Sequence, residues 1–139
     1  VSLTSAELLL AKDLVIDGGA GGVTVSRAAG SPSFRIFQIG STRTVTLRRL
    51  IISGGIAANG GGILNSGSLT LDQCSVTGNT STNTGGGGGG IFNLGTLQVT
   101  GSTISGNTAA FLGGGIWNRF TSAPGSATLT NSSVSSNTA

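Results

Sequence analysis

Few side chains in this sequence could do acid–base chemistry. The chain has four acidic residues and no histidine, and only Asp13 and Asp17 lie close together along it. Enzymes that cleave polysaccharides use clustered carboxylates, often with basic groups or a metal ion, to move protons at the sugar. A single pair of carboxylates is a poor match to that pattern, and we interpret both as solvated ends of strands. We therefore expect no catalytic residue, no metal site and no cofactor.

The other charged residues and the single cysteine limit the kinds of partner that the chain could have. Five arginines lie between positions 27 and 49, and the only charged residue after Asp72 is Arg119. Basic chains often bind nucleic acid, but no aromatic stacking platform accompanies these arginines, so we expect no nucleic-acid partner. No apolar run approaches the roughly 18 residues of a membrane-spanning helix, and we expect no membrane insertion. The single cysteine, Cys74, excludes an intrachain disulfide, and we expect it to be buried.

Internal repeats supply the elements that position every other candidate residue. Three stretches are versions of one unit: GGGILNSGSLTLDQCSVTGNT (60–80), GGGIFNLGTLQVTGSTISGNT (88–108) and GGGIWNRFTSAPGSATLTNSSVSSNT (113–138). A fainter copy covers 37–55, and the first copy, 6–19, keeps only apolar pairs and closing glycines. Equivalent residues recur every 24 to 30 positions. Apolar and polar residues alternate within each unit, which is the period of a β-strand.

A unit of this kind cannot bury its apolar side alone and must stack on its neighbours. The repeats therefore predict an all-β fold, a single parallel β-helix of about five coils with about 4.8 Å between coils. The glycines recur in register before an inward isoleucine, which predicts tight corners and argues against a flexible linker. The predicted inward ladder consists of Leu47, Ile52, Ile63, Leu69, Leu71, Val76, Ile91, Leu97, Val99, Ile104, Ile116, Leu129 and Val134.

The domain organisation follows from how regular the copies are. We predict one β-helix domain over 1–139, with regular repeats over 37–139 and an irregular N-terminal coil and partial cap over 1–36. The stretch VSLTSAELLLAKDLVI (1–16) is the candidate for the partial cap, and within it SAELLLAK (5–12) is the one segment with good helix propensity.

The pattern GGGI-x-N, followed by (L/V)T(L/V) and STISGNTA, resembles the repeats of right-handed parallel β-helix proteins of bacterial surfaces. These include repeats of the polymorphic outer-membrane-protein type and large secreted adhesin-like chains. The resemblance implies a right-handed coil and an extracellular or cell-surface location. It also implies a non-enzymatic structural role, as a rigid module of an adhesin or stalk or as a subunit of a self-stacking filament. Such a fold serves many functions, and a glycan-binding or polysaccharide-active β-helix is the alternative.

Two sets of recurring side chains could form functional surfaces. The asparagines of the repeat predict two ladders along the axis, in which each amide bonds to the next coil; they are Asn65, Asn93 and Asn118 in one and Asn79, Asn107 and Asn137 in the other. If the repeat isoleucines point inward, Leu64, Phe92 and Trp117 point outward and form a stripe. The stripe is either an exposed contact for glycan or protein or is covered by loops.

The outer faces and the ends of the coil suggest further partners. Outward Ser and Thr columns, such as Thr44/Thr46 and Ser68/Thr70, resemble the flat Thr-x-Thr face of ice-binding β-helices, and ice binding is a third function to weigh. The sequence SSNTA at the C-terminus shows no polar cap, and bare strand edges favour further pairing. We therefore expect the partners to be other copies stacked end to end or neighbouring coils of a longer chain, together with a glycan or a host surface.

Overall fold

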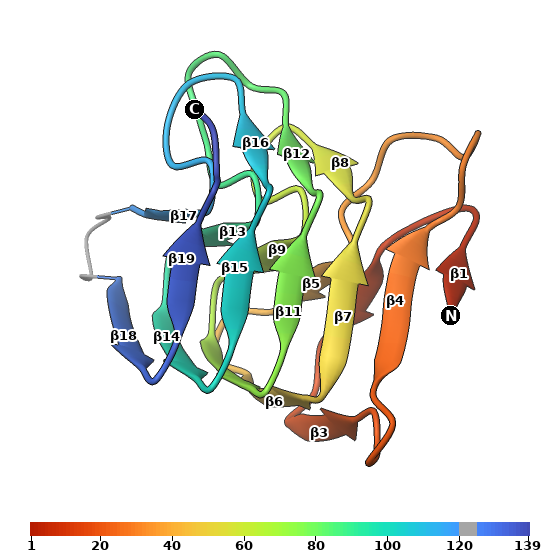
Figure 1. The fold of residues 1–139 in the computed structure, drawn as a ribbon, viewed down its shortest axis with the longest axis vertical. Helices are drawn as coiled ribbons and strands as arrows, with labels where there is room; N and C mark the ends of the chain where they lie inside the picture. The colour runs from red at the N-terminus through yellow and green to blue at the C-terminus, as the bar shows by residue number, and fades with distance from the viewer. Residues whose placement is uncertain (120–124) are drawn as a thin grey trace.

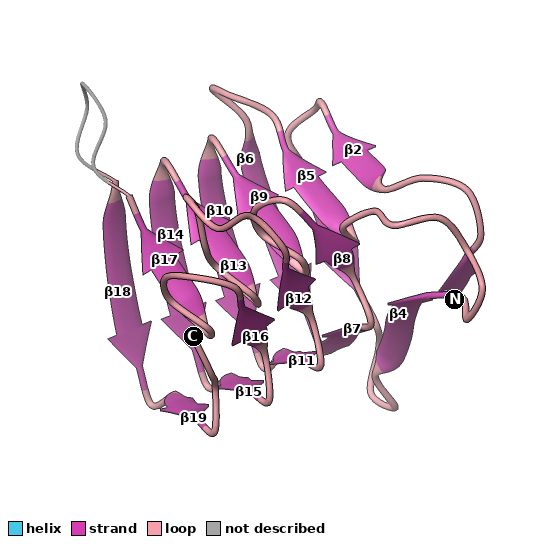
Figure 2. Ribbon diagram, turned by 90° about the horizontal axis from the view of Figure 1, so that it is seen from above, coloured by secondary structure: helices cyan, strands magenta, loops and turns pink. Residues whose placement is uncertain are grey.

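The computed structural model describes residues 1–119 and 125–139 of the chain. These residues form a right-handed parallel β-helix of about five turns (Figures 1 and 2). The described residues contain strands and turns only, so no helix among them is long and apolar enough to cross a membrane.

Each coil contributes one strand to each of up to four parallel sheets, which are named here by their first strands. The β2 sheet contains β2 (Leu8–Leu10), β5 (Phe37–Ile39), β9 (Ile63–Asn65), β13 (Ile91–Asn93) and β17 (Ile116–Asn118). The β3 sheet contains β3 (Leu14–Asp17), β6 (Thr44–Arg48), β10 (Ser68–Asp72), β14 (Thr96–Thr100) and β18 (Ser126–Thr130). The β1 sheet contains β1 (Ser2–Leu3), β4 (Val23–Arg27), β7 (Leu50–Ser53), β11 (Ser75–Thr77), β15 (Thr103–Ser105) and β19 (Ser133–Ser135). The short β8 sheet contains β8 (Ile56–Ala57), β12 (Thr80–Ser81) and β16 (Thr108–Ala109).

The register of the strands is the register of the repeat. Leu69 pairs with Val45 on one side and with Leu97 on the other, and Ile91 pairs with Ile63 and Ile116. Because a shift of one residue would turn every inward side chain outward, the apolar columns hold all coils in this alignment.

The core is a column of stacked aliphatic side chains inside the coil. The predicted inward residues from Leu47 to Ile104 are fully buried or nearly so. Ile116 is half-buried and packs against the core, whereas Leu129 and Val134 are 43% and 46% exposed. The last two belong to the final described coil, which has no neighbour on its outer side.

The triple glycines form one corner of the coil, as their register predicted. A Cβ atom on Gly61 or Gly89 would lie 2.3 Å from the carbonyl oxygen of Thr80 or Thr108, the residue that ends the same repeat unit. The first glycine of each triplet has a positive φ, as at Gly88 with a φ of +72°. The last three residues of the six-glycine run are therefore a tight, ordered corner in which no other residue fits.

A second corner, between the β3 and β1 sheets, is an unforeseen stack of left-handed residues. Arg49, Gln73, Gly101 and Asn131 each follow a strand of the β3 sheet and have φ values of 51°, 54°, 55° and 49°. The N–H of Arg49, Gln73 and Gly101 each donates to the last carbonyl of the strand in the next coil, at 3.0 Å. This bend turns the chain from one sheet to the next within one or two residues.

The N-terminal stretch is strand, although SAELLLAK has good helix propensity. Strand β2 lies within SAELLLAK and pairs with β5, and strand β3 pairs with β6. Leu8 and Leu10 stack on Phe37 and Ile39 of the next coil, so burial against the core outweighs the local helix propensity. Strand β1 then pairs with the free edge of β4.

Candidate functional site

The first asparagine ladder lies inside the coil, at the end of the β2 sheet. The side-chain amide of Asn65 donates to Oδ1 of Asn93 at 2.7 Å, and that of Asn93 donates to Oδ1 of Asn118, also at 2.7 Å. Asn65 and Asn93 are fully buried. Their amides also bond to the carbonyls of Thr96 and Gly95, at 2.9 Å each, so the ladder ties the corner of one coil to the next.

The second asparagine ladder lies at the corner between the β1 and β8 sheets. Asn79 donates both its backbone N–H and its Nδ2 to Oδ1 of Asn107, each at 3.0 Å. Asn107 bonds in the same way to Oδ1 of Asn137, at 3.0 and 2.9 Å. The ladder begins at Gly55, whose N–H donates to Oδ1 of Asn79 at 3.0 Å.

A third polar ladder was missed in the sequence. The N–H of Cys74 donates to Oγ of Ser102 at 2.9 Å, and the N–H of Ser102 donates to Oγ of Ser132 at 3.1 Å. The Cys74 thiol donates to the carbonyl of Leu47 at 3.2 Å. The signal was available, because Cys74, Ser102 and Ser132 all stand two residues after a strand of the β3 sheet. The cysteine is one rung of this ladder, and burial raises the pKa of its thiol.

The three ladders share one polarity. In the second and third ladders a backbone N–H of each coil donates toward the C-terminal end of the coil, and the next coil supplies the side-chain acceptor. In the first ladder the side-chain amide donates in that same direction. Each coil therefore completes the hydrogen bonds of the coil before it.

The predicted stripe exists as a column, but its central member is not a surface residue. Leu64, Phe92 and Trp117 pair in register across β9, β13 and β17. Phe92 is only 4% exposed. The glycine corner approaches it so closely that a Cβ atom added to Gly60 would lie 3.1 Å from the Cβ atom of Phe92. Its ring centroid lies 4.9 Å from that of Trp117. Phe92 is therefore covered and is not a surface contact, whereas the side chains of Leu64 and Trp117 are half-buried.

The carboxylates are held by structural partners. Oδ1 of Asp13 accepts a hydrogen bond from the N–H of Thr44 at 2.8 Å. Asp17 accepts one from Gly19 and forms an ion pair with Arg49, and these contacts lower the pKa of Asp17 below its ordinary value. Asp72 lies 3.3 Å from the guanidinium of Arg48.

The carboxylates do not match the requirements of a glycosidase. A general acid in such an enzyme needs a raised pKa, which is the opposite of the shift in the pKa of Asp17. No cluster of three metal-ligating side chains occurs within 1–119 and 125–139.

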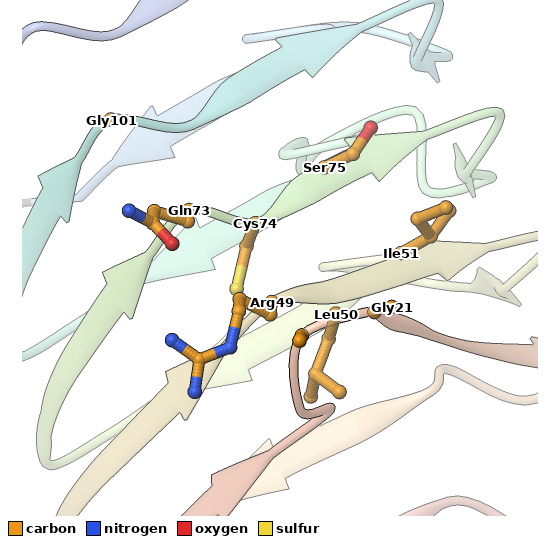
Figure 3. A pocket seen from close by; sticks show the side chains of 10 residues that line it. Gly21, Arg49, Leu50, Ile51, Gln73, Cys74, Ser75 and Gly101 are labelled. Carbon is orange, nitrogen blue, oxygen red and sulfur yellow. The ribbon is translucent and has the colours of Figure 1, made fainter.

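Two shallow grooves lie over corners of the coil. The first, of about 340 Å³, lies over the left-handed corner, with Arg49, Gln73, Cys74 and Gly101 in its wall (Figure 3). The second, of about 370 Å³, lies over the corner between the β2 and β3 sheets. It is lined by hydroxyl, glycine and apolar residues of three successive coils together with one cation: Thr42, Arg43, Thr44, Ser66, Gly67, Ser68, Leu94, Gly95 and Thr96.

The outer hydroxyl columns lie on the β3 sheet. Thr46, Thr70, Gln98 and Thr128 pair in register, and Val15 continues this column in the first coil. Gln98 and Val15 interrupt the array of hydroxyls that a Thr-x-Thr face would need.

The last described coil forms one end of the stack. Strands β17, β18 and β19 are the edge strands of the three large sheets at this end. Leu129 and Val134, which are exposed there, stand in the same columns as Val99 and Ile104, which are 1% and 0% exposed.

Comparison with known proteins adds no relative to this description. No family model, no curated protein and no solved structure matches the chain.

Proposed function

We propose that this chain is a non-enzymatic structural protein, a rigid β-helix module of an extracellular stalk or adhesin. The observation that carries the proposal is the set of polar ladders in the coil, in which Asn65 and Asn93, or Asn79 and Asn107, bond to each other across successive coils while fully buried.

The interior of the coil supports a mechanical role. Parallel strands and stacked aliphatic columns link the coils along one axis. Three hydrogen-bonded ladders add side-chain bonds between the last three described coils. Bending the axis would break ladder bonds between buried groups, and buried polar groups without partners are costly. A coil of this kind resists deformation along its whole length and suits a spacer or stalk.

The extracellular and bacterial parts of the proposal rest on the resemblance of the GGGI-x-N repeats to those of bacterial surface proteins. An antibody against the chain should label intact cells that express it. Labelling that requires permeabilised cells would contradict the location.

The non-enzymatic part is tested on polysaccharides. Acidic and neutral polysaccharides incubated with the chain should keep their length and yield no new reducing or unsaturated ends. Turnover that disappears in Asp17→Asn, with the fold intact by circular dichroism, would overturn this part of the proposal.

A second candidate, glycan binding without turnover, is favoured by the groove around Arg43. Its volume of about 370 Å³ falls within the range of small-molecule sites. Hydroxyl groups from three coils line it beside a cation. This arrangement suits an acidic sugar, whose hydroxyls and carboxylate or sulfate both find partners.

A further inference from the structure

The connection between the β2 and β3 sheets is longer in the second coil than in the next two. Four residues, 40–43, connect β5 to β6, whereas two residues each, 66–67 and 94–95, connect β9 to β10 and β13 to β14. The core fills the inside of the coil, so the additional residues Ser41 and Thr42 lie outside it and are exposed. The turn of the second coil therefore forms a wall at one end of the groove around Arg43.

The floor of this groove is bare backbone. Gly67 and Gly95 line it, one from the third coil and one from the fourth. A Cβ atom on Gly67 would clash with the carbonyl oxygen of Arg43, and one on Gly95 with that of Gly67. Stacking of the coils thus keeps side chains out of the floor, and the groove extends along the axis by about 4.8 Å per coil. A sugar residue advances a glycan chain by a similar distance, so one sugar can lie over each coil.

The remaining lining of the groove suits neutral sugars. Four hydroxyl side chains belong to it: Thr44, Ser66, Ser68 and Thr96. None of these hydroxyls forms a hydrogen bond with a described residue, whereas the hydroxyl of Ser102 donates to the carbonyl of Thr100. Leu94 adds one apolar side chain. A sugar ring presents both hydroxyls and C–H groups, and free hydroxyls beside an apolar group match it.

Positive charge is confined to the walled end of the groove. Among the described residues, Arg43 is the one arginine whose guanidinium has no hydrogen bond, ion pair or aromatic ring as a partner. Lys12 takes the equivalent position in the first coil, by the register of β3 and β6. Asp13, which follows it, offsets one of these two charges. One net positive charge remains at this end, and the rest of the lining is uncharged.

From this arrangement we propose that the groove binds the end of a glycan chain whose terminal sugar is acidic. The carboxylate or sulfate of that sugar pairs with Arg43, where the wall of the second coil stops the chain. Neutral sugars follow over Gly67 and Gly95. The inference rests on the glycan-binding candidate described above and specifies its ligand.

The test titrates the full chain with defined sugars and follows its backbone amide signals by NMR. Sialyllactose carries a terminal carboxylate and lactose sulfated on its galactose carries a sulfate, while lactose and the methyl ester of sialyllactose are neutral. The acidic sugars should shift the signals of Arg43, Gly67 and Gly95 with saturation. They should bind at least about tenfold more tightly than the neutral ones, because a hydrogen bond to a charged group is worth about that much. The tighter of the two acidic sugars identifies the acidic group, and equal binding of acidic and neutral sugars would overturn the proposal.

Variants separate the charged end of the groove from its neutral part. Arg43→Gln should weaken binding of the acidic sugars at least about tenfold, and Ser68→Ala about fivefold. Thr70→Val is the matched control, since it removes a hydroxyl from the same strand but outside the lining of the groove. It should bind as the unmodified chain does, and circular dichroism should show one fold for all three. Unchanged binding by Arg43→Gln, or equal losses in the Ser68 and Thr70 variants, would contradict the assignment.

Two further measurements address the direction of the chain and its end. A nitroxide on the reducing end of sialyllactose should broaden the amide signals of Gly95 and Thr96 more than that of Arg43, and the reverse would overturn the inference. Polygalacturonate with blocked non-reducing ends has internal acidic sugars only and should bind at least about tenfold more weakly than sialyllactose. Equal binding would overturn the chain-end inference while leaving glycan binding in place. Binding of no acidic sugar at all would remove both, and the structural role would stand alone.

Discussion

Asn79 donates both its backbone N–H and its side-chain amide to the same oxygen, Oδ1 of Asn107, each at 3.0 Å. Both residues are fully buried. The pair shows how this coil holds together: one carboxamide satisfies two donors of the previous coil, and its own donors bond to Val76 and Asn137. Removing one rung therefore leaves several buried groups without partners.

We predict that Asn107→Ala lowers the free energy of unfolding by about 3 kcal/mol, because two donors of Asn79 lose their acceptor in a buried site. Asn137→Ala is the matched control, since Asn137 occupies the same column in the last coil, where water reaches it. It should cost clearly less. Urea unfolding followed by circular dichroism gives both values, and equal losses would contradict the role of burial.

The six-glycine run contains two different kinds of glycine. We predict that Gly89→Ala lowers stability by about 2–3 kcal/mol, since its Cβ would lie 2.3 Å from the carbonyl oxygen of Thr108 and overpacking of this size forces the backbone apart. A Cβ on Gly85 meets only Oδ1 of Asn83, at 3.7 Å, so Gly85→Ala should change stability by less than about 0.5 kcal/mol. If both substitutions are tolerated, the run is not a tight corner.

The repeat made the coil predictable, because the columns of Ile63, Ile91 and Asn65 alternate at fixed spacing and each coil must bury its neighbour's apolar side. The buried core from Leu47 to Ile104 and the glycine corner followed from the same columns. Local signals failed where tertiary contacts decide. SAELLLAK is strand because Leu8 and Leu10 complete the core columns, and its helix propensity is worth less than that burial.

Other features of the structure have no signal in the sequence, or have a signal that the sequence analysis did not recognise. Arg49 and Gln73 adopt left-handed conformations with φ values of 51° and 54°, and neither residue type favours that region. The ladder of Cys74, Ser102 and Ser132 mixes a thiol with hydroxyls, so the column does not stand out by residue identity. The burial of Phe92 depends on how closely the glycine corner approaches β13, which spacing along the chain does not specify.

The position of Cys74 in a column of serines gives a test of that ladder. We predict that Cys74→Ser changes the free energy of unfolding by less than about 1 kcal/mol, because a hydroxyl can donate to the carbonyl of Leu47 as the thiol does and serine already fills this column at Ser102 and Ser132. Cys74→Val removes the donor at similar volume and should cost more. Thermal unfolding of the two variants side by side decides between a ladder rung and a simple apolar filler, for which valine would be the better replacement.

The ion pair of Asp17 and Arg49 should make stability depend on pH in the acid range. The hydrogen bond from Gly19 and the contact with Arg49 lower the pKa of Asp17 in the folded chain. A carboxylate with a lowered pKa stabilises the fold above its unfolded pKa, about 3.9, and this contribution is lost as the pH falls through the folded pKa. We therefore predict that Asp17→Asn lowers the melting temperature at pH 7, and that the gap to the unmodified chain closes as the pH falls through the lowered pKa of Asp17.

Glu7→Gln is the control for that comparison, since it removes the same charge from a residue that forms no ion pair with any described residue. Its melting temperature should follow that of the unmodified chain over the same pH range. A gap for Asp17→Asn that persists unchanged to pH 2 would show that the substitution acts through packing or the Gly19 hydrogen bond and not through the charge.

The groove around Arg43 yields the prediction that separates a bare spacer from a glycan-binding one. The guanidinium of Arg43 forms no ion pair or hydrogen bond with the described residues, unlike those of Arg48 and Arg49. If the groove binds an acidic sugar, a sulfated or uronate-containing polysaccharide should bind at low salt. Arg43→Ala should then weaken binding at least about tenfold, because a charge-assisted contact is stronger than a neutral one, while Arg43→Lys should keep part of it. Arg48→Ala, which removes a cation at the far end of strand β6 and outside the lining of the groove, is the matched control and should bind as before. Equal losses in the Arg43 and Arg48 variants would mean attraction to net charge alone, and no binding by any acidic glycan would leave the chain as a spacer.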